Sequence, residues 1–222
     1  MIQLADRVLA MEESATIAMS KKSRELKSEG KDVISLSLGE PDFFTPDFIN
    51  TEAVQAIKDN YSKYTPVSGY EDLREAIANK FQRDNGLNYQ KENIIVSTGA
   101  KQSIINVVMT IVNHGDEVII PAPYWVSYIE MVKVVEGVPV IVSADIESDF
   151  KISSVQLEAA ITPKTKLMIF SSPCNPTGSV YTKEELAGLA KVIAKYPQIV
   201  VICDEIYEHI RFEGKHESLA QF

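Results

Sequence analysis

Short, continuous apolar runs alternate along this chain with longer segments whose apolar residues recur every three to four positions. Such runs are rich in β-branched residues and show no polar alternation, which is typical of strands that are buried on both faces of a sheet. The expected strands are residues 33–38, 94–96, 117–120, 138–142, 167–170 and 199–203. The segments between them favour helices on both faces, so the sequence predicts an α/β fold with a mostly parallel (mixed) sheet flanked by helices.

Helical periodicity is clearest between the last two expected strands. Thr182 and Glu185 have the spacing of a capping box, in which each side chain accepts a hydrogen bond from the other residue's backbone N–H. Ser153 and Gln156 give a similar start to a helix over residues 154–162. Further expected helices are a charged one over residues 4–29, one whose apolar face runs from Leu73 to Phe81, and one with a face from Ile104 to Ile111.

Composition and charge exclude several classes of partner. The 222 residues are 45% hydrophobic, which is enough for a sizeable core. A net charge of −9 without long blocks of one sign argues against nucleic acid and anionic membranes as partners. The first residues are charged and the longest clean apolar run, residues 199–203, is short, so we expect no targeting segment and no membrane span. Cys174 and Cys203 form no C-x-x-C pair, and we expect a reducing, cytoplasmic location.

Small and polar residues follow the expected strands, at the sheet edge where α/β proteins bind their ligands. Residues 97–102 lead straight into a helix, so their backbone N–H groups suit a phosphate, although they also fit an ordinary tight turn. Trp125, the only tryptophan, follows Pro123 and fits either a ring-stacking position or the rim of the core. Residues 171–178 form a cluster of turn formers around Asn175, which fits a surface loop or a binding loop.

Asp204 ends the last apolar run. A carboxylate at the end of a buried strand loses hydration, which favours a cation or a protonated ring nitrogen as its partner. An apolar strand that ends in Asp-Glu is also typical of an ATPase, but the chain contains no G-x-x-x-x-G-K-[ST] motif, and it contains no G-x-G-x-x-G, H-E-x-x-H or G-x-S-x-G motif. The histidines show no metal-ligand spacing, so we expect no metal site and surface or loop positions for His114, His209 and His216.

Six segments, taken in order, closely resemble the class I aminotransferases, which are fold-type I pyridoxal-phosphate (PLP) enzymes. They are residues 39–43, 63–69, 98–102, 123–125, 175–178 and 204–207. The match covers essentially the whole chain and is most similar to the bacterial aspartate aminotransferases. It implies the PLP-binding large domain of that fold in truncated form, with residues 46–222 in this domain and residues 1–45 packing with a missing small domain.

The resemblance also implies how the cofactor, pyridoxal 5′-phosphate, would be held. The backbone of Gly99, Ala100 and Lys101 would bind its phosphate at a helix N-terminus, and Trp125 would stack on its ring. Tyr64 would reach the phosphate bound by a neighbouring subunit, which implies a homodimer.

Three further side chains would contact the cofactor ring by the same resemblance. Asn175 and Tyr207 would hydrogen-bond the ring hydroxyl oxygen, and Asp204 would pair with the ring nitrogen and keep it protonated. The residues implied to contact the amino-acid substrate are Gly39, Trp125, Asn175 and the Lys101 side chain, the last of these with Thr16.

The implied reaction transfers the amino group of L-aspartate to 2-oxoglutarate, giving oxaloacetate and L-glutamate. The family's Schiff-base lysine is expected beyond Phe222, so no catalytic residue is assigned within these residues, and we expect the 222 residues alone to be inactive and to expose apolar surface. The alternatives are an aromatic or broad-specificity aminotransferase, a carbon–sulfur lyase of the same fold type, and a non-catalytic PLP-binding or dimerisation module.

Overall fold

The computed structural model describes residues 2–12, 15–36, 39 and 43–222. The chain divides into two compact units, one of Met1–Glu12 with Glu71–Phe222 and the other of Glu13–Tyr70. The sequence-based boundary near residue 45 remains a prediction about the intact domains.

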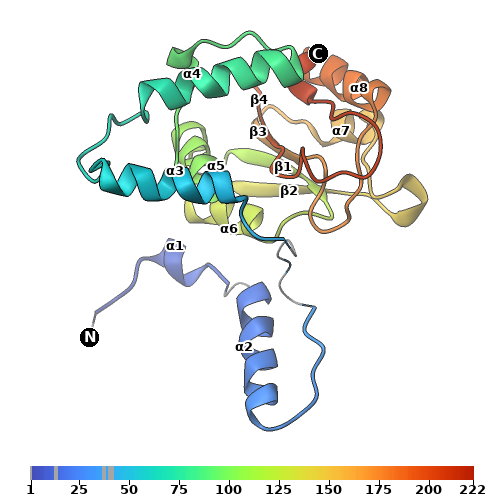
Figure 1. Cartoon of the computed structure of the whole chain (residues 1–222). Coiled ribbons are helices and arrows are strands. Elements are labelled where there is room, and N and C mark those ends of the chain that lie inside the picture. The colour runs from blue at the N-terminus through green and yellow to red at the C-terminus, as the bar shows by residue number, and fades with distance from the viewer. Residues whose placement is uncertain (1, 13–14, 37–38, 40–42) are drawn as a thin grey trace. The chain divides into compact units, whose positions relative to one another are not determined.

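A four-stranded sheet forms the centre of the larger unit (Figure 1). Its strands are β1 (Glu117–Ala122), β2 (Val138–Ser143), β3 (Thr165–Ser171) and β4 (Val200–Asp204). They lie in the order β2-β1-β3-β4, and all three pairings are parallel, so the predicted α/β fold is confirmed. The register pairs Ser171 with Asp204, which brings the ends of β3 and β4 to the same edge of the sheet.

Helices cover both faces of this sheet (Figure 1). The covering helices are α5 (Ala100–Ile111) and α6 (Ser127–Val134) on one face, and α7 (Ser154–Ala160) and α8 (Lys183–Ile193) on the other. Val118 and Ile120 of β1 pack with α5 and α6, whereas Ile119 packs with α7 and α8. Because successive strand residues point to opposite faces and both faces are covered, the strand reads as a continuous apolar run.

Both predicted capping boxes are present. The Thr182 hydroxyl accepts from the Glu185 N–H at 3.2 Å, and the Glu185 carboxylate accepts from the Thr182 N–H at 2.7 Å. Ser153 and Gln156 make the same reciprocal contacts at the start of α7. These local signals are satisfied within four residues, which explains why the sequence alone placed the starts of both helices.

The single helix predicted over residues 4–29 is wrong. The chain forms two helices instead, α1 (Asp6–Leu9) and α2 (Ala15–Ser28). The break coincides with the boundary between the two compact units. Helix α1 belongs to the larger unit and α2 to the smaller one. In the larger unit the Glu12 N–H donates to Oε2 of Glu130 in α6 at 3.0 Å, a tertiary contact that helical periodicity does not reveal.

Two expected strands are not formed. Residues 33–36 are not in a strand, and Ser37 and Leu38 lie outside the described residues. Residues 94–96 are also outside the sheet, although Ile94 has extended backbone angles (φ −108°, ψ 131°). A strand requires a hydrogen-bonded neighbour as well as β-branched residues, and none of the described pairings includes this segment.

The remaining elements complete the two units. The helix expected from Leu73 to Phe81 is α4 (Glu71–Lys80), which continues into a π-helical turn, Phe81–Asn85. The sequence patterns did not indicate α3 (Asp47–Lys58) or α6. Short 3-10 turns span Lys91–Asn93, Ile146–Ser148 and Leu219–Gln221.

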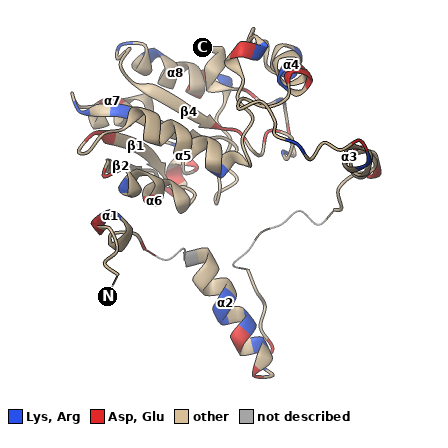
Figure 2. Ribbon diagram, turned by 90° about the vertical axis from the view of Figure 1, so that its left-hand side faces the viewer, with Lys and Arg blue, Asp and Glu red and all other residues tan. Residues whose placement is uncertain are grey.

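The surface carries both charged and apolar side chains. Figure 2 shows Lys and Arg interspersed with Asp and Glu along α2 and over the helices of the larger unit. Ile95, Met109 and Ile206 of the larger unit are 72%, 65% and 61% exposed. Self-association through such surface remains a prediction. None of the helices in the described part of the chain is long and apolar enough to cross a bilayer.

Candidate active site

The N-terminus of α5 provides free backbone donors at the edge of the sheet. Gly99 precedes the helix, and its carbonyl accepts from the N–H groups of Gln102 and Ser103 at 3.1 and 3.3 Å. The N–H groups of Ala100 and Lys101 come before these first helical bonds and have no acceptor within the helix. Together with the helix dipole they suit the anionic phosphate that the sequence predicted here.

The backbone conformation at position 99 requires a glycine. Its angles, φ 86° and ψ 158°, lie in a region that is essentially restricted to glycine. A Cβ atom at this position would meet nothing within 4 Å, so the cost of a side chain is backbone strain rather than a clash.

We expect Gly99→Ala to destabilise the fold by about 1–3 kcal/mol, because alanine must either hold this strained conformation or move the start of α5. Urea unfolding of the variant beside the wild type measures the loss. Gly39→Ala is the matched control, since Gly39 has no positive φ and equally open surroundings. Equal unfolding free energies for Gly99→Ala and the wild type would contradict the assignment of strain.

A row of contacting side chains connects α5 to the end of β4. The Lys101 ammonium lies 4.8 Å from the centroid of the Trp125 ring, and Trp125 meets Tyr128 edge-on at 5.6 Å. The Tyr128 hydroxyl donates to Oδ2 of Asp204 at 2.6 Å. The structure therefore brings three predicted site residues together through Tyr128, which the sequence reasoning missed.

Asp204 is a carboxylate without a cationic partner in the described part of the chain. Its Oδ1 accepts from the Ile206 N–H at 3.3 Å, and the ion pairs of the described residues do not include it. Burial, and next the hydrogen bond to Asp204, raise the pKa of Tyr128, so the phenol remains a neutral donor. Burial also raises the pKa of the neighbouring Cys203 thiol to about 12. This arrangement fits a ligand that brings a protonated ring nitrogen.

The segment after β4 borders two cavities. Asp204 lines a cavity of about 280 Å³ together with Ala100 at the start of α5. Tyr207 and Asn175 line a larger cavity of about 920 Å³, where the Asn175 amide donates to the Tyr207 hydroxyl at 3.4 Å. The turn after β4 therefore borders three kinds of group. These are the free N–H groups at the start of α5, the Asp204 carboxylate, and the hydrogen-bonded pair of Asn175 and Tyr207.

Three predicted site residues belong to the smaller unit. Tyr64 is fully exposed there, and Gly39 is exposed and lies outside any helix or strand. Thr16 of α2 lines a cavity of about 500 Å³ within the same unit. The roles of these residues in binding remain predictions, and their neighbours Glu40, Pro41 and Asp42 lie outside the described residues.

The three histidines occupy surface or loop positions, as the sequence predicted. His114 and His209 are exposed, as predicted, whereas the His216 side chain is in a loop but only 9% exposed, with Nε2 at 3.2 Å from Oε2 of Glu205. Glu205, Glu208 and His216 offer possible metal-ligand atoms within 4.8 Å of one another, which the linear spacing did not show. Lys80 already supplies a positive charge there, because its ammonium donates to both carboxylate oxygens of Glu208.

Residues 31–221 match the family model for aminotransferase class I and II, so this chain belongs to that family, whose fold is PLP-dependent. Two of its relatives are named as aspartate/prephenate aminotransferases, the first of them as a probable one. The chain is 54% identical to a probable aspartate/prephenate aminotransferase of Rhizobium leguminosarum over 209 residues, which are 94% of this chain and 52% of the relative. It is 49% identical to the aspartate/prephenate aminotransferase of Nitrosomonas europaea, covering 96% of this chain and 54% of the relative.

Solved structures of similar proteins agree with this assignment. The aspartate aminotransferase of Rhizobium meliloti has a TM-score of 0.96 at 41% identity, covering 99% of this chain and 55% of that one. The Thermus thermophilus aspartate aminotransferase with maleate has a TM-score of 0.95 at 44% identity, covering 100% and 58%. The expected family and large-domain fold are confirmed, and the chain spans about half the length of the relatives it matches.

Proposed function

We propose that the protein containing these residues is a PLP-dependent aminotransferase that converts L-aspartate and 2-oxoglutarate to oxaloacetate and L-glutamate. The names of its relatives support prephenate, which carries a 2-oxo acid group, as a second amino acceptor. The observation that carries the proposal is Asp204. It is a carboxylate with a neutral donor and no described cation, and it lines one cavity with the α5 N-terminus.

The residues of the larger unit fit this cofactor by their chemistry. Bound PLP withdraws electrons from the α-carbon of the amino acid. Asp204 holds a proton on the ring nitrogen, which strengthens that withdrawal, and the N–H groups of Ala100 and Lys101 hold the phosphate. Trp125 covers one ring face and excludes water from it.

Asn175 and Tyr207 orient the ring in this proposal. Both can donate to the ring hydroxyl oxygen, and their 3.4 Å contact supports a shared acceptor between them. The same Asn175 and Trp125, with Gly39 and the Lys101 ammonium, contact the amino-acid substrate in our proposal. A dicarboxylate suits Lys101, and the maleate of the Thermus thermophilus structure is a dicarboxylate bound by that protein.

The assembly in our proposal is a cytoplasmic homodimer in which Tyr64 of each subunit reaches the phosphate bound by the other. Residues 1–45 pack with the small domain, and residues 46–222 belong to the PLP-binding large domain. Sedimentation equilibrium of the PLP-bound protein tests the dimer. Mixed dimers of Tyr64→Phe with an Asp204→Asn variant then test whether Tyr64 acts across the interface.

The expected result of the functional test is cofactor binding followed by amino transfer. PLP binding is measured by equilibrium dialysis, and oxaloacetate formation from aspartate is measured with 2-oxoglutarate and with prephenate as acceptors. A lyase would release a 2-oxo acid without an acceptor, an aromatic aminotransferase would prefer phenylalanine or tyrosine, and a binding module would hold PLP without turnover. Absence of PLP binding would contradict the proposal altogether.

Lys101→Ala separates the aspartate assignment from its aromatic rival within the same assay. The variant keeps the backbone N–H for the phosphate and removes the ammonium. We therefore expect a higher KM for aspartate and 2-oxoglutarate and a nearly unchanged KM for aromatic substrates. An equal change for both classes would contradict the substrate role of Lys101.

The Schiff-base lysine is tested separately. Borohydride reduction of the PLP-bound protein fixes the cofactor to its lysine, and peptide mapping then locates it. A modified lysine outside residues 1–222 supports the prediction, and one within these residues contradicts it. In the first case the isolated 222 residues should show no transamination.

A further inference from the structure

The turn after β4 carries Tyr207, which the proposed function places on the cofactor together with Asp204 at the end of β4. Residues 205–210 form neither a helix nor a strand. Bonds from the Glu208 N–H to the Glu205 carbonyl and from the Ile210 N–H to the Tyr207 carbonyl, both 2.9 Å, close the turn locally. Such local bonds alone open at low cost, so the position of the Tyr207 side chain depends on what holds the turn from outside.

Glu208, the residue after Tyr207, is held by α4. The Lys80 ammonium donates to Oε1 and Oε2 of Glu208 at 2.6 and 2.5 Å, and it also donates to Oδ1 of Asn85 at 3.0 Å. The Lys80 and Glu208 side chains are only 23% and 19% exposed. Charge-assisted hydrogen bonds with this limited access to water are stronger than exposed surface pairs.

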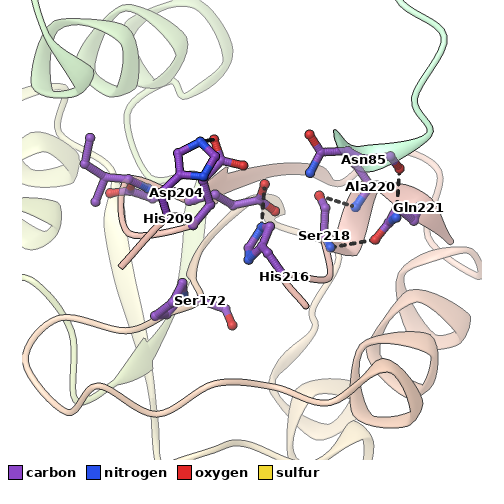
Figure 3. A network of polar contacts seen from close by, with 12 residues as sticks. Asn85, Ser172, Asp204, His209, His216, Ser218, Ala220 and Gln221 are labelled. Atoms are coloured by element: carbon purple, nitrogen blue, oxygen red, sulfur yellow. Dashed lines mark hydrogen bonds and ion pairs between the residues drawn. The ribbon is translucent and has the colours of Figure 1, made fainter. Parts of the chain in front are cut away.

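Glu205, the residue after Asp204, lies beside the last segment of the chain, where Nε2 of His216 is 3.2 Å from Oε2 of Glu205 without making a hydrogen bond. This segment is itself anchored. The Ser218 hydroxyl accepts from the Ala220 N–H at 3.2 Å, and the Gln221 amide donates to the Asn85 carbonyl at 2.7 Å. The Ser218 N–H also donates to the Gln221 side-chain oxygen at 2.7 Å, and Figure 3 shows Asn85, Gln221 and Ser218 joined in this way beside His216.

These contacts connect the turn to α4 and to the last segment of the chain. Lys80 binds both Glu208 and Asn85, and the Asn85 carbonyl in turn accepts from Gln221. We propose that Lys80 is a positioning residue for the cofactor site. Lys80 acts through Glu208 on Tyr207, so that the Tyr207 hydroxyl faces the same ligand as the Asp204 carboxylate. This inference rests on the proposed PLP function.

The test uses the PLP-bound protein and does not depend on turnover. Lys80→Met removes the ammonium, and Lys80→Arg keeps a positive charge. We expect Lys80→Met to weaken PLP binding by about tenfold or more and to reduce the visible circular dichroism of the bound cofactor, with Lys80→Arg recovering most of both signals. Lys195→Met is the matched control, because it breaks an exposed 2.7 Å pair with Glu158 and should change neither signal.

A double-mutant cycle distinguishes positioning from general stability. In a Tyr207→Phe background the hydroxyl that Lys80 positions is absent, so Lys80→Met should weaken PLP binding by about threefold or less. Thermal unfolding of every variant is measured in parallel. If Lys80→Met does not fold, Glu208→Gln replaces it in the same cycle, since it removes the charge and keeps the side-chain shape.

The outcomes separate this inference from the proposed function. If the wild type binds PLP and Lys80→Met binds it equally well, the inference is overturned and the proposed function stands. Fully additive effects of Lys80→Met and Tyr207→Phe also overturn it, because they show that Lys80 does not act through Tyr207. A wild type that does not bind PLP overturns both.

Discussion

Asp204→Asn is expected to weaken PLP binding by about 10²- to 10⁴-fold, the effect of removing one partner from a buried charge pair. The described cations do not pair with Asp204, so its negative charge is available to the protonated ring nitrogen. Asparagine has almost the same shape but no charge, and the ring nitrogen would then lose its proton. Transamination should fall at least in proportion to the loss of protonated cofactor.

Equilibrium dialysis and the absorbance spectrum of the bound cofactor measure this effect. Tyr128→Phe is the control, because it removes the 2.6 Å hydrogen bond and leaves the Asp204 charge in place. Its expected cost is about tenfold or less in PLP affinity. If Asp204→Asn bound PLP as tightly as the wild type, Asp204 would not be the partner of the ring nitrogen.

Leu186→Ala should lower the free energy of unfolding by about 2–5 kcal/mol, which is a large part of the stability of a typical domain. Leu186 is fully buried on α8, in the cluster that contains Ile119 and Met168 of the sheet. The substitution removes apolar contacts and leaves a cavity, because neighbouring strands in a parallel sheet cannot collapse far into it.

Urea denaturation followed by far-ultraviolet circular dichroism measures this loss. Val155→Ala on α7 is the matched control, because Val155 is 77% exposed and the change should cost about 0.5 kcal/mol or less. Equal effects of the two substitutions would contradict the assignment of the core to the α7–α8 face of the sheet.

Apolar runs in the sequence predicted some of the strands correctly and others not. The runs at residues 117–120 and 167–170 lie in the middle of the sheet, where both faces are buried, and they were predicted correctly. The run at residues 94–96, Ile-Ile-Val, is equally apolar but has no described strand partner. Composition reports how well a residue fits a sheet, whereas pairing depends on which other segment lies beside it.

The candidate site divides in a similar way. The sequence predicted Asp204, Asn175 and the Gly99 turn as site residues, because each follows an apolar run and belongs to a short motif, and their binding roles stay predictions. Tyr128 was not, since nothing near it in the sequence indicates a contact with a carboxylate 76 positions away. One available signal was its position three residues after Trp125 at the start of a helix, where side chains share a face.

The sequence by itself determined the family, the parallel sheet with helices on both faces, the capped starts of α7 and α8, and the segments that carry the candidate site. These features can be recognised in the sequence because capping boxes have a fixed residue spacing and strands buried on two faces are continuous apolar runs. Only the tertiary structure decided which polar groups meet: Tyr128 with Asp204, Lys80 with Glu208, and His216 with Glu205. Such pairs depend on side chains from elements far apart in the chain, because packing the helices on the sheet sets their distances.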